Sequence, residues 1–167
     1  GVLTLHRPSN VDDKEAFIRI LDALEKIGER ISLVFPLHPR TRARAEEFGL
    51  TKRLESIPNI VLTGPAGYLD FVALMAESKL VLTDSGGLQE ETTALGIPCL
   101  TLRENTERPI TVTEGTNTIV GNSTQAILKS AHDILDNGGK AGRIPELWDG
   151  NTAERIADII ADVISED

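Results

Sequence analysis

Residues 81–91 contain an apolar run, a pair of glycines and a helix-forming stretch, in that order. The apolar run stops at Thr83, and Ser85, Gly86 and Gly87 follow closely. This order predicts a strand, a tight turn and the N-terminus of a helix. Free N–H groups at a helix N-terminus attract phosphate, and glycine lacks the Cβ atom that would keep a phosphate away from the backbone. We therefore expect the serine and the two glycines to hold phosphate groups.

Two carboxylates, Glu90 and Glu91, follow in the same predicted helix. A carboxylate is better suited to sugar hydroxyls than to phosphate, as on the ribose of dinucleotide sites. Adjacent residues do not share a helix face, so at most one of the two is expected to face a ligand. The alternative is surface charge in a first helical turn, which the helix dipole favours in any case. The pattern points to a nucleoside diphosphate, with its ribose on one carboxylate.

Apolar runs and helical patterns alternate along all 167 residues. The apolar runs predict strands at 2–5, 31–35, 59–62, 79–83, 98–102 and 117–120. Helices are predicted at 13–27, 40–48, 68–78, 86–95, 109–115 and 123–135, with a last one from 151 or 152. This alternation is typical of βαβ units, and strands without alternating polarity suit a sheet covered on both faces. We expect a single α/β domain over residues 1–167, a Rossmann-like three-layer sandwich with a parallel sheet of about six strands.

Three details of these helices are also predicted. Asn10 or Asp12 is expected to cap the helix at 13–27, and Gly28 to lie just past its end. The last helix carries an apolar side, formed by Ile156, Ile159, Ile160 and Val163.

The chain has a net charge of −9 and one cysteine. An acidic chain lacks the basic face that general nucleic-acid binding requires, so we expect no nucleic-acid partner. Cys99 stands alone, which excludes a disulfide framework and favours a reducing, cytoplasmic compartment. No apolar run reaches membrane-spanning length, so we expect no membrane partner. The histidines lack cysteine partners at metal-ligand spacing, and we expect no metal site.

Polar or glycine-rich loops follow the first five predicted strands. They contain His6 and Arg7; His38 between two prolines; Gly64 and Pro65; residues 85–87; and residues 103–108. In open α/β sheets, ligands bind beyond the carboxyl ends of the strands. The convergence of these loops at one edge therefore predicts a binding site, more strongly than any single motif does.

The charged residues of these loops also have structural interpretations. His6 and Arg7 could simply be solvated residues of a loop that leads into a helix. The functional alternative is that they bind phosphate or take part in catalysis. For His38 the two interpretations are equally supported. One of Arg103 and Arg108 is expected to reach a phosphate, while the other pairs with a neighbouring carboxylate.

Two aromatic residues, Tyr68 and Phe71, lie three positions apart on a predicted helix. Core packing is the default expectation for both. The sharper alternative is that one of the two rings stacks on uracil.

Several motifs, in order along almost the whole chain, resemble one known family. They are Thr4-Leu5-His6-Arg7, Leu37-His38-Pro39, Asp84-Ser85-Gly86-Gly87-Leu88-Gln89-Glu90-Glu91, Leu95-Gly96-Ile97-Pro98, Thr106-Glu107-Arg108-Pro109 and Gly115-Thr116-Asn117. Together they resemble the non-hydrolysing UDP-N-acetylglucosamine 2-epimerases, which have the GT-B architecture of two Rossmann-like domains around an active-site cleft. The resemblance covers only the C-terminal, nucleotide-binding half, and so implies an N-terminal domain of about equal size that is absent from this sequence.

The resemblance implies an isomerase that interconverts UDP-GlcNAc and UDP-ManNAc without a cofactor. UDP is eliminated to give 2-acetamidoglucal and is re-added with the C2 proton on the other face. The acid/base carboxylates of the family belong to the N-terminal half, so this chain alone is expected to bind UDP weakly and not to epimerise. A homodimer of the full-length enzyme fits the resemblance, although the residues themselves do not define the oligomeric state.

The resemblance also assigns roles residue by residue. Catalytic roles fall to His6 and Arg108, which would stabilise negative charge on the departing UDP. UDP-binding roles fall to Arg7, His38, Gly64, Pro65, Phe71, Ser85, Gly86, Gly87, Glu91 and Arg108. In this assignment residues 85–87 hold the diphosphate, Glu91 holds the ribose, and Phe71 with the loop at 64–65 holds the uracil.

One departure from the family concerns Pro8-Ser9-Asn10, where many bacterial members have Arg-Glu-Asn. That glutamate belongs to a region linked to allosteric activation by UDP-GlcNAc. Ser9 cannot supply a carboxylate, so we do not expect this regulation here. Four other interpretations stay open: a GT-B glycosyltransferase donor domain, a non-catalytic nucleotide-sugar-binding module, a hydrolysing epimerase, and an epimerase of a diacetamido or uronic sugar.

Overall fold

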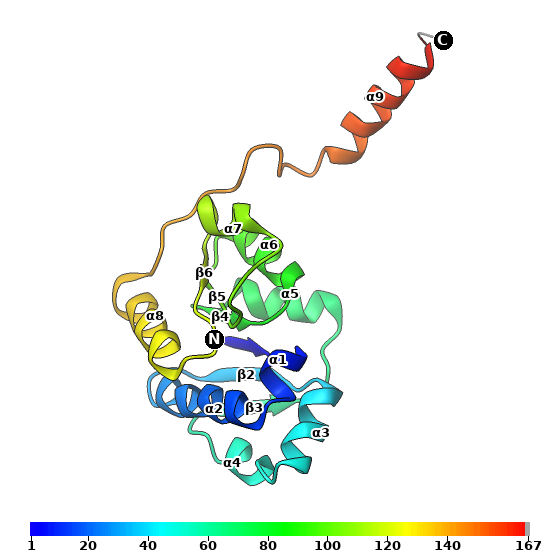
Figure 1. Cartoon of the computed structure of the whole chain (residues 1–167). Coiled ribbons are helices and arrows are strands. Elements are labelled where there is room, and N and C mark those ends of the chain that lie inside the picture. The colour runs from blue at the N-terminus through cyan, green and yellow to red at the C-terminus, as the bar shows by residue number, and fades with distance from the viewer. Residues whose placement is uncertain (166–167) are drawn as a thin grey trace.

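Six parallel strands form one sheet in the computed structural model, which describes residues 1–165 (Figure 1). They are β1 (Val2–Thr4), β2 (Leu33–Pro36), β3 (Ile60–Thr63), β4 (Val81–Thr83), β5 (Cys99–Thr101) and β6 (Asn117–Ile119). Their order across the sheet is β3-β2-β1-β4-β5-β6. The strand order reverses between β1 and β4, and in doubly wound sheets such a switch point is where ligands bind.

Helices cover both faces of this sheet. They are α1 (Pro8–Val11), α2 (Lys14–Gly28), α3 (Pro39–Glu47), α4 (Thr51–Glu55), α5 (Tyr68–Ala76), α6 (Gly86–Leu95), α7 (Pro109–Thr113), α8 (Thr124–Asn137) and α9 (Thr152–Ser165). The helices α2 and α8 pack against each other on one face, and α5 and α6 pack on the other. The predicted three-layer Rossmann-like fold is confirmed.

The strand register determines which side chains enter each core. Leu3 pairs with Leu82, and Leu82 pairs with Leu100, so one row of leucines faces the larger core beneath α2 and α8. The alternate residues Val2 and Val81 face a smaller core on the other side. Both rows are buried because helices cover both faces, which explains the continuous apolar runs in the sequence.

Some predicted boundaries are wrong for local reasons. The N-cap of α2 is Asp13, whose side chain accepts hydrogen bonds from the N–H groups of Glu15 and Ala16. Asn10 does not cap this helix and is buried instead. Gly28 is the last residue of α2 rather than the residue past its end. The short helices α1 and α4 were not predicted, since four or five residues are too few for an apolar period to be visible.

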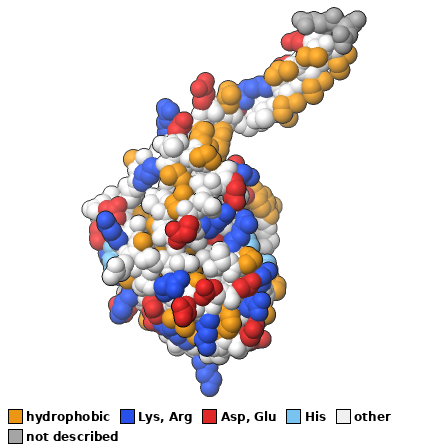
Figure 2. Space-filling model, viewed as in Figure 1, with side chains coloured by type: hydrophobic (Ala, Val, Ile, Leu, Met, Phe, Trp, Pro, Cys, Tyr) orange, Lys and Arg blue, Asp and Glu red, His pale blue; other side chains and the backbone are white. Residues whose placement is uncertain are grey.

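The last helix, α9, stands away from the domain at the end of an extended segment (Figure 1). None of its residues is buried. Its apolar side is solvent-exposed and consists of Ile156, Ile159, Ile160, Val163 and Ile164, seen as a hydrophobic stripe in Figure 2. Among residues 1–165, no helix is both long enough and apolar enough to cross a membrane.

Candidate functional site

A cleft of about 280 Å³ lies at the carboxyl ends of β1, β2 and β4, next to the switch point. Five residues predicted from the sequence line it: His6, His38, Pro65, Phe71 and Ser85. A larger hollow of about 480 Å³ lies beside the C-terminal part of α8, and none of the predicted site residues lines it. The position at the switch point, rather than the volume, marks the smaller cleft as the candidate site.

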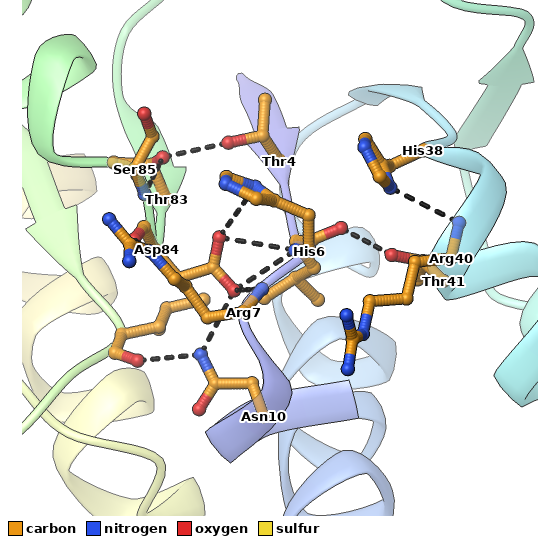
Figure 3. Close-up of polar contacts among 12 residues, drawn as sticks. Thr4, His6, Arg7, Asn10, His38, Arg40, Thr41, Thr83, Asp84 and Ser85 are labelled. Carbon is orange, nitrogen blue, oxygen red and sulfur yellow. Dashed lines mark hydrogen bonds and ion pairs between the residues drawn. The ribbon is translucent and has the colours of Figure 1, made fainter. Parts of the chain in front are cut away.

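Two histidines lie near each other at this cleft (Figure 3). The ring centroids of His6 and His38 are 5.4 Å apart, and the ring planes are inclined by 38°. Nδ1 of His38 accepts a hydrogen bond from the N–H of Arg40 at 3.1 Å, so His38 also caps α3. His38 therefore has the structural role that the sequence left open, and it lines the cleft as well.

Asp84 is a residue of this site that sequence reasoning missed. Its carboxylate is fully buried and lies 3.0 Å from Nδ1 of His6. It also accepts hydrogen bonds from the N–H of Arg7 at 2.8 Å and from Nδ2 of Asn10 at 3.2 Å. The available signal was an aspartate at the end of a buried strand, directly before the serine and the glycines.

The turn before α6 has the geometry expected of an anion site. Ser85 occupies the N-cap position, but its side chain forms no cap hydrogen bond, and its N–H donates to Thr83 Oγ1 at 2.9 Å. The first N–H groups of a helix have no acceptor within the helix. A Cβ atom added to Gly87 would meet no heavy atom of the described residues within 4 Å. This leaves out the chain neighbours of Gly87 and the backbone of its own helix. The backbone at Gly87 is therefore sterically open, whereas the Glu107 carboxylate oxygen lies 3.7 Å from the Cβ position of Gly86.

The two carboxylates of α6 have different surroundings. Glu90 Oε1 lies 3.0 Å from Nε of Arg108, and both side chains are about half exposed. Glu91 Oε2 is buried and has no hydrogen-bond partner among the described residues. Burial, and then the nearby charge of Glu90, raise the pKa of Glu91 above its ordinary value. Glu91 therefore differs from Glu90 in having an unpaired oxygen among the described residues, and its contact with a ribose stays a prediction.

The loop after β5 contains a second ion pair. Arg103 donates from two nitrogens to the carboxylate of Glu107, at 2.7 and 2.9 Å. These hydrogen bonds lower the pKa of Glu107 to about 2. Arg103 thus pairs with a neighbour, and Arg108 contacts Glu90 and also donates from its guanidinium group to the main-chain oxygen of Glu107 at 3.2 Å. Both arginines are therefore paired with carboxylates, and the contact of one of them with a phosphate stays a prediction.

The two aromatic residues of α5 differ in burial. Tyr68 is 68% exposed, so the default expectation of core packing is wrong for it. Phe71 packs against the smaller core and also lines the cleft, next to Pro65. Of the two rings, Phe71 is the one that lines the cleft, and its contact with uracil stays a prediction.

The other predicted site residues do not line the cleft. Gly64 precedes Pro65 in the chain, and Gly86 and Gly87 follow Ser85 in the first turn of α6. Arg7 donates from Nε to the main-chain oxygen of Asp84 at 3.3 Å. Glu91 and Arg108 lie along α6 and beside it. Their contact with a ligand stays a prediction.

A sequence model of the family described as UDP-N-acetylglucosamine 2-epimerase matches residues 1–161. The chain belongs to this family. The UDP-N-acetylglucosamine 2-epimerase of Methanocaldococcus jannaschii is 42% identical over 161 residues, which are 95% of this chain and 43% of that protein. The UDP-2,3-diacetamido-2,3-dideoxy-D-glucuronate 2-epimerase of Pseudomonas aeruginosa is 39% identical over 164 residues, again 95% of this chain and 43% of that protein.

Solved epimerase structures share this fold. The M. jannaschii UDP-GlcNAc 2-epimerase, in complex with UDP-GlcNAc and UDP, matches with a TM-score of 0.86 at 42% identity. The match covers 96% of this chain and 44% of that one. The predicted family and fold are therefore confirmed, and the chain spans less than half the length of the 2-epimerases it matches.

Proposed function

We propose that this chain is the UDP-binding, C-terminal half of a 2-epimerase that interconverts UDP-GlcNAc and UDP-ManNAc. The observation that carries the proposal is the Glu91 oxygen without a partner in the second turn of α6, a helix whose first turn has open space at Gly87. An apolar wall formed by Phe71 and Pro65 lines the adjoining cleft. Carboxylate, anion site and apolar wall match the ribose, diphosphate and uracil of UDP.

The residues of the site suit a diphosphate as leaving group. Elimination breaks the bond between the sugar C1 and the diphosphate oxygen, removes the C2 proton, and leaves the electron pair of the broken bond on UDP. Donors aimed at that oxygen stabilise the developing charge most. In this proposal His6 and the N-terminus of α6 supply those donors, and Arg108 turns from Glu90 to the diphosphate. Arg7 and His38 bind UDP without taking part in proton transfer.

The acid/base groups at C2 are assigned to a second domain. Supporting observations are the 43% coverage of the M. jannaschii relative and the apolar side of α9, which lies exposed in this chain. Helix faces of this kind usually pack against another element. We propose that the second domain covers α9 in the whole enzyme, and that the chain alone does not epimerise. The homodimer and the cytoplasmic location stay predictions.

The sugar is a separate question, because a relative named for a diacetamido glucuronate is 39% identical to this chain. The alternative is therefore an epimerase of such a sugar with the same UDP site. Parallel assays of the whole enzyme with UDP-GlcNAc and with the diacetamido substrate distinguish the two. Turnover of the diacetamido substrate alone would favour the alternative.

Two measurements test the proposed function. Isothermal titration of UDP into the chain should show weak binding that Glu91→Ala abolishes, whereas Glu55→Ala, at an exposed position in α4, should keep it. In the whole enzyme, exchange of the C2 hydrogen with deuterated solvent should accompany turnover. A glycosyltransferase donor domain would bind UDP but show no exchange at C2. Absence of UDP binding to both the chain and the whole enzyme would refute the proposal.

A further inference from the structure

Asp84 connects the end of β4 to the loop that carries His6 (Figure 3). Its Oδ2 accepts from the N–H of Arg7 at 2.8 Å and from Nδ2 of Asn10 at 3.2 Å. The N–H of His6 lies 3.0 Å from Oδ2 and 3.2 Å from Oδ1. Oδ1 also faces Nδ1 of the His6 ring, 3.0 Å away. Both carboxylate oxygens therefore have donors, and only Oδ1 contacts the imidazole.

These donors keep Asp84 ionised. Burial raises the pKa of this carboxyl group, but the hydrogen bonds from the His6 side chain and from the N–H groups of Arg7 and His6 bring it below its ordinary value. An ionised carboxylate only accepts hydrogen bonds. Nδ1 of His6 therefore carries a proton, and in the neutral ring Nε2 holds the lone pair. Within residues 1–165, Nε2 has no hydrogen-bond partner.

We propose that Asp84 is a positioning residue, which holds His6 as the Nδ1–H tautomer and presents Nε2 to the diphosphate in the cleft. This inference rests on the proposed function, because it takes UDP as the group that His6 contacts. Asp84 lies behind the ring and touches no substrate. When the ring is protonated, Nε2–H donates to a diphosphate oxygen, and the carboxylate stabilises the imidazolium without accepting a proton itself.

The two oxygens of Asp84 accept from different donors, so the orientation of the amide group in Asp84→Asn can be predicted. Oδ2 receives the N–H groups of Arg7 and His6 and the amide of Asn10, so the amide oxygen of the new asparagine should occupy this position. Its NH2 group then takes the place of Oδ1 and points at Nδ1 of His6. A donor at this position requires Nδ1 to accept, and the ring should change to the Nε2–H tautomer.

Long-range nitrogen–proton NMR of the chain, labelled at histidine, measures the tautomer directly. At about pH 9, where histidine is ordinarily neutral, we expect Nδ1–H for His6 in the wild type and Nε2–H in Asp84→Asn. His38→Gln and His132→Gln assign the His6 signals. Thr41→Val is the control, since it removes a nearby buried hydrogen bond to the main-chain oxygen of Leu5 without touching the imidazole.

The wild-type tautomer is informative even if Asp84→Asn does not fold. An Nε2–H ring in the wild type overturns the proposal, and so does an Nδ1–H ring in the folded variant. UDP titration supplies the second readout. Asp84→Asn removes the carboxylate that stabilises the imidazolium, so a neutral donor replaces the charged one at the diphosphate and UDP should bind at least about tenfold more weakly than to the wild type. Thr41→Val should bind UDP equally well. Equal UDP affinity of Asp84→Asn and the wild type overturns the proposal. A wild-type chain that binds no UDP refutes the proposed function instead, and the tautomer still decides whether Asp84 orients His6.

Discussion

The side chain of Gln89 donates from Nε2 to the main-chain oxygen of Ser85 at 3.1 Å. At its other end, Oε1 accepts from Nδ2 of Asn117 at 3.1 Å and from the hydroxyl of Thr106. The Thr106 oxygen accepts the N–H of Arg108 at 2.9 Å. One fully buried side chain therefore connects the turn before α6 to the loop that carries Arg108.

Gln89→Leu should lower both stability and UDP affinity. Leucine nearly fills the same volume but removes the partner of the Ser85 main-chain oxygen and of the Thr106 hydroxyl, both partly buried, while the Asn117 amide keeps its bond to Thr111 Oγ1. Each buried polar group left unsatisfied costs about 1–3 kcal/mol, so we expect the free energy of unfolding to fall by at least about 2 kcal/mol. The turn and the loop also lose their connection, which should weaken UDP binding. Urea unfolding and calorimetric titration measure the two effects.

Gln125→Leu is the matched control for that variant. Gln125 lies on α8 and is exposed, so the same chemical change should alter the free energy of unfolding by less than about 0.5 kcal/mol. If Gln89→Leu and Gln125→Leu have equal stability and equal UDP affinity, the connecting role of Gln89 is wrong.

Because the apolar face of α9 is exposed, shortening one of its large side chains should hardly change the free energy of unfolding. Ile160→Ala should change the free energy of unfolding of the chain by less than about 0.5 kcal/mol, because no residue of α9 is buried. Ile27→Ala in α2 makes the same truncation at a fully buried position and should cost about 2–5 kcal/mol. Urea unfolding followed by circular dichroism compares the two. A loss of more than about 1 kcal/mol in Ile160→Ala would mean that α9 packs on this domain.

Most of the sheet and much of the cleft could be predicted from the sequence. The strands are short apolar runs that end at polar or glycine-rich loops, and parallel topology brings those loops to one edge. That reasoning placed His6, His38 and Ser85 at one edge, and they line one cleft. The end of α6 at Gly96 could also be predicted from the local sequence. Gly96 has a left-handed φ of 71°, a conformation that glycine adopts readily.

The parts that could not be predicted depend on distant contacts. His6 and Asp84 are 78 positions apart, and no local pattern indicates that their side chains meet. Glu90 and Glu91 are identical in type, and only the position of Arg108 shows which carboxylate is already paired. The apolar side of α9 was visible in the sequence, but periodicity identifies an apolar face without identifying what covers it.

Two glycine substitutions separate ligand contact from packing. Gly87→Ala adds a methyl group in open space and in a helical turn, so stability should stay constant or rise by up to about 1 kcal/mol. UDP affinity should fall, because the methyl group occupies the space proposed for phosphate. In Gly28→Ala the added Cβ would lie 2.2 Å from the main-chain oxygen of Pro58, and we expect a loss of about 1–3 kcal/mol.

Thermal unfolding and UDP titration of both glycine variants give the comparison. Unchanged UDP affinity in Gly87→Ala would contradict the assignment of phosphate to this turn. A stable Gly28→Ala protein would contradict the close packing of α2 on the segment before β3.

The partly buried carboxylate of Glu91 should make stability and ligand binding respond in opposite directions. Its folded-state pKa lies above the ordinary value of 4.5, so the folded chain keeps this proton at pH values where the unfolded chain has lost it. The contribution of Glu91 to stability is therefore most favourable below pH 4.5 and declines as the pH rises through the raised pKa. Glutamine cannot ionise, so Glu91→Gln should be more stable than the wild type at pH 7, and this difference should shrink on acidification.

UDP binding should change the other way. Glu91→Gln replaces charge-assisted hydrogen bonds to the ribose hydroxyls by neutral ones, and we expect UDP affinity to fall by about 10- to 100-fold. Urea unfolding at pH 4 and pH 7, with UDP titration at pH 7, measures both effects. Glu55→Gln, at an exposed position in α4, should change neither. A Glu91→Gln chain that is less stable at pH 7 and binds UDP like the wild type would show that Glu91 serves the fold and not the ligand.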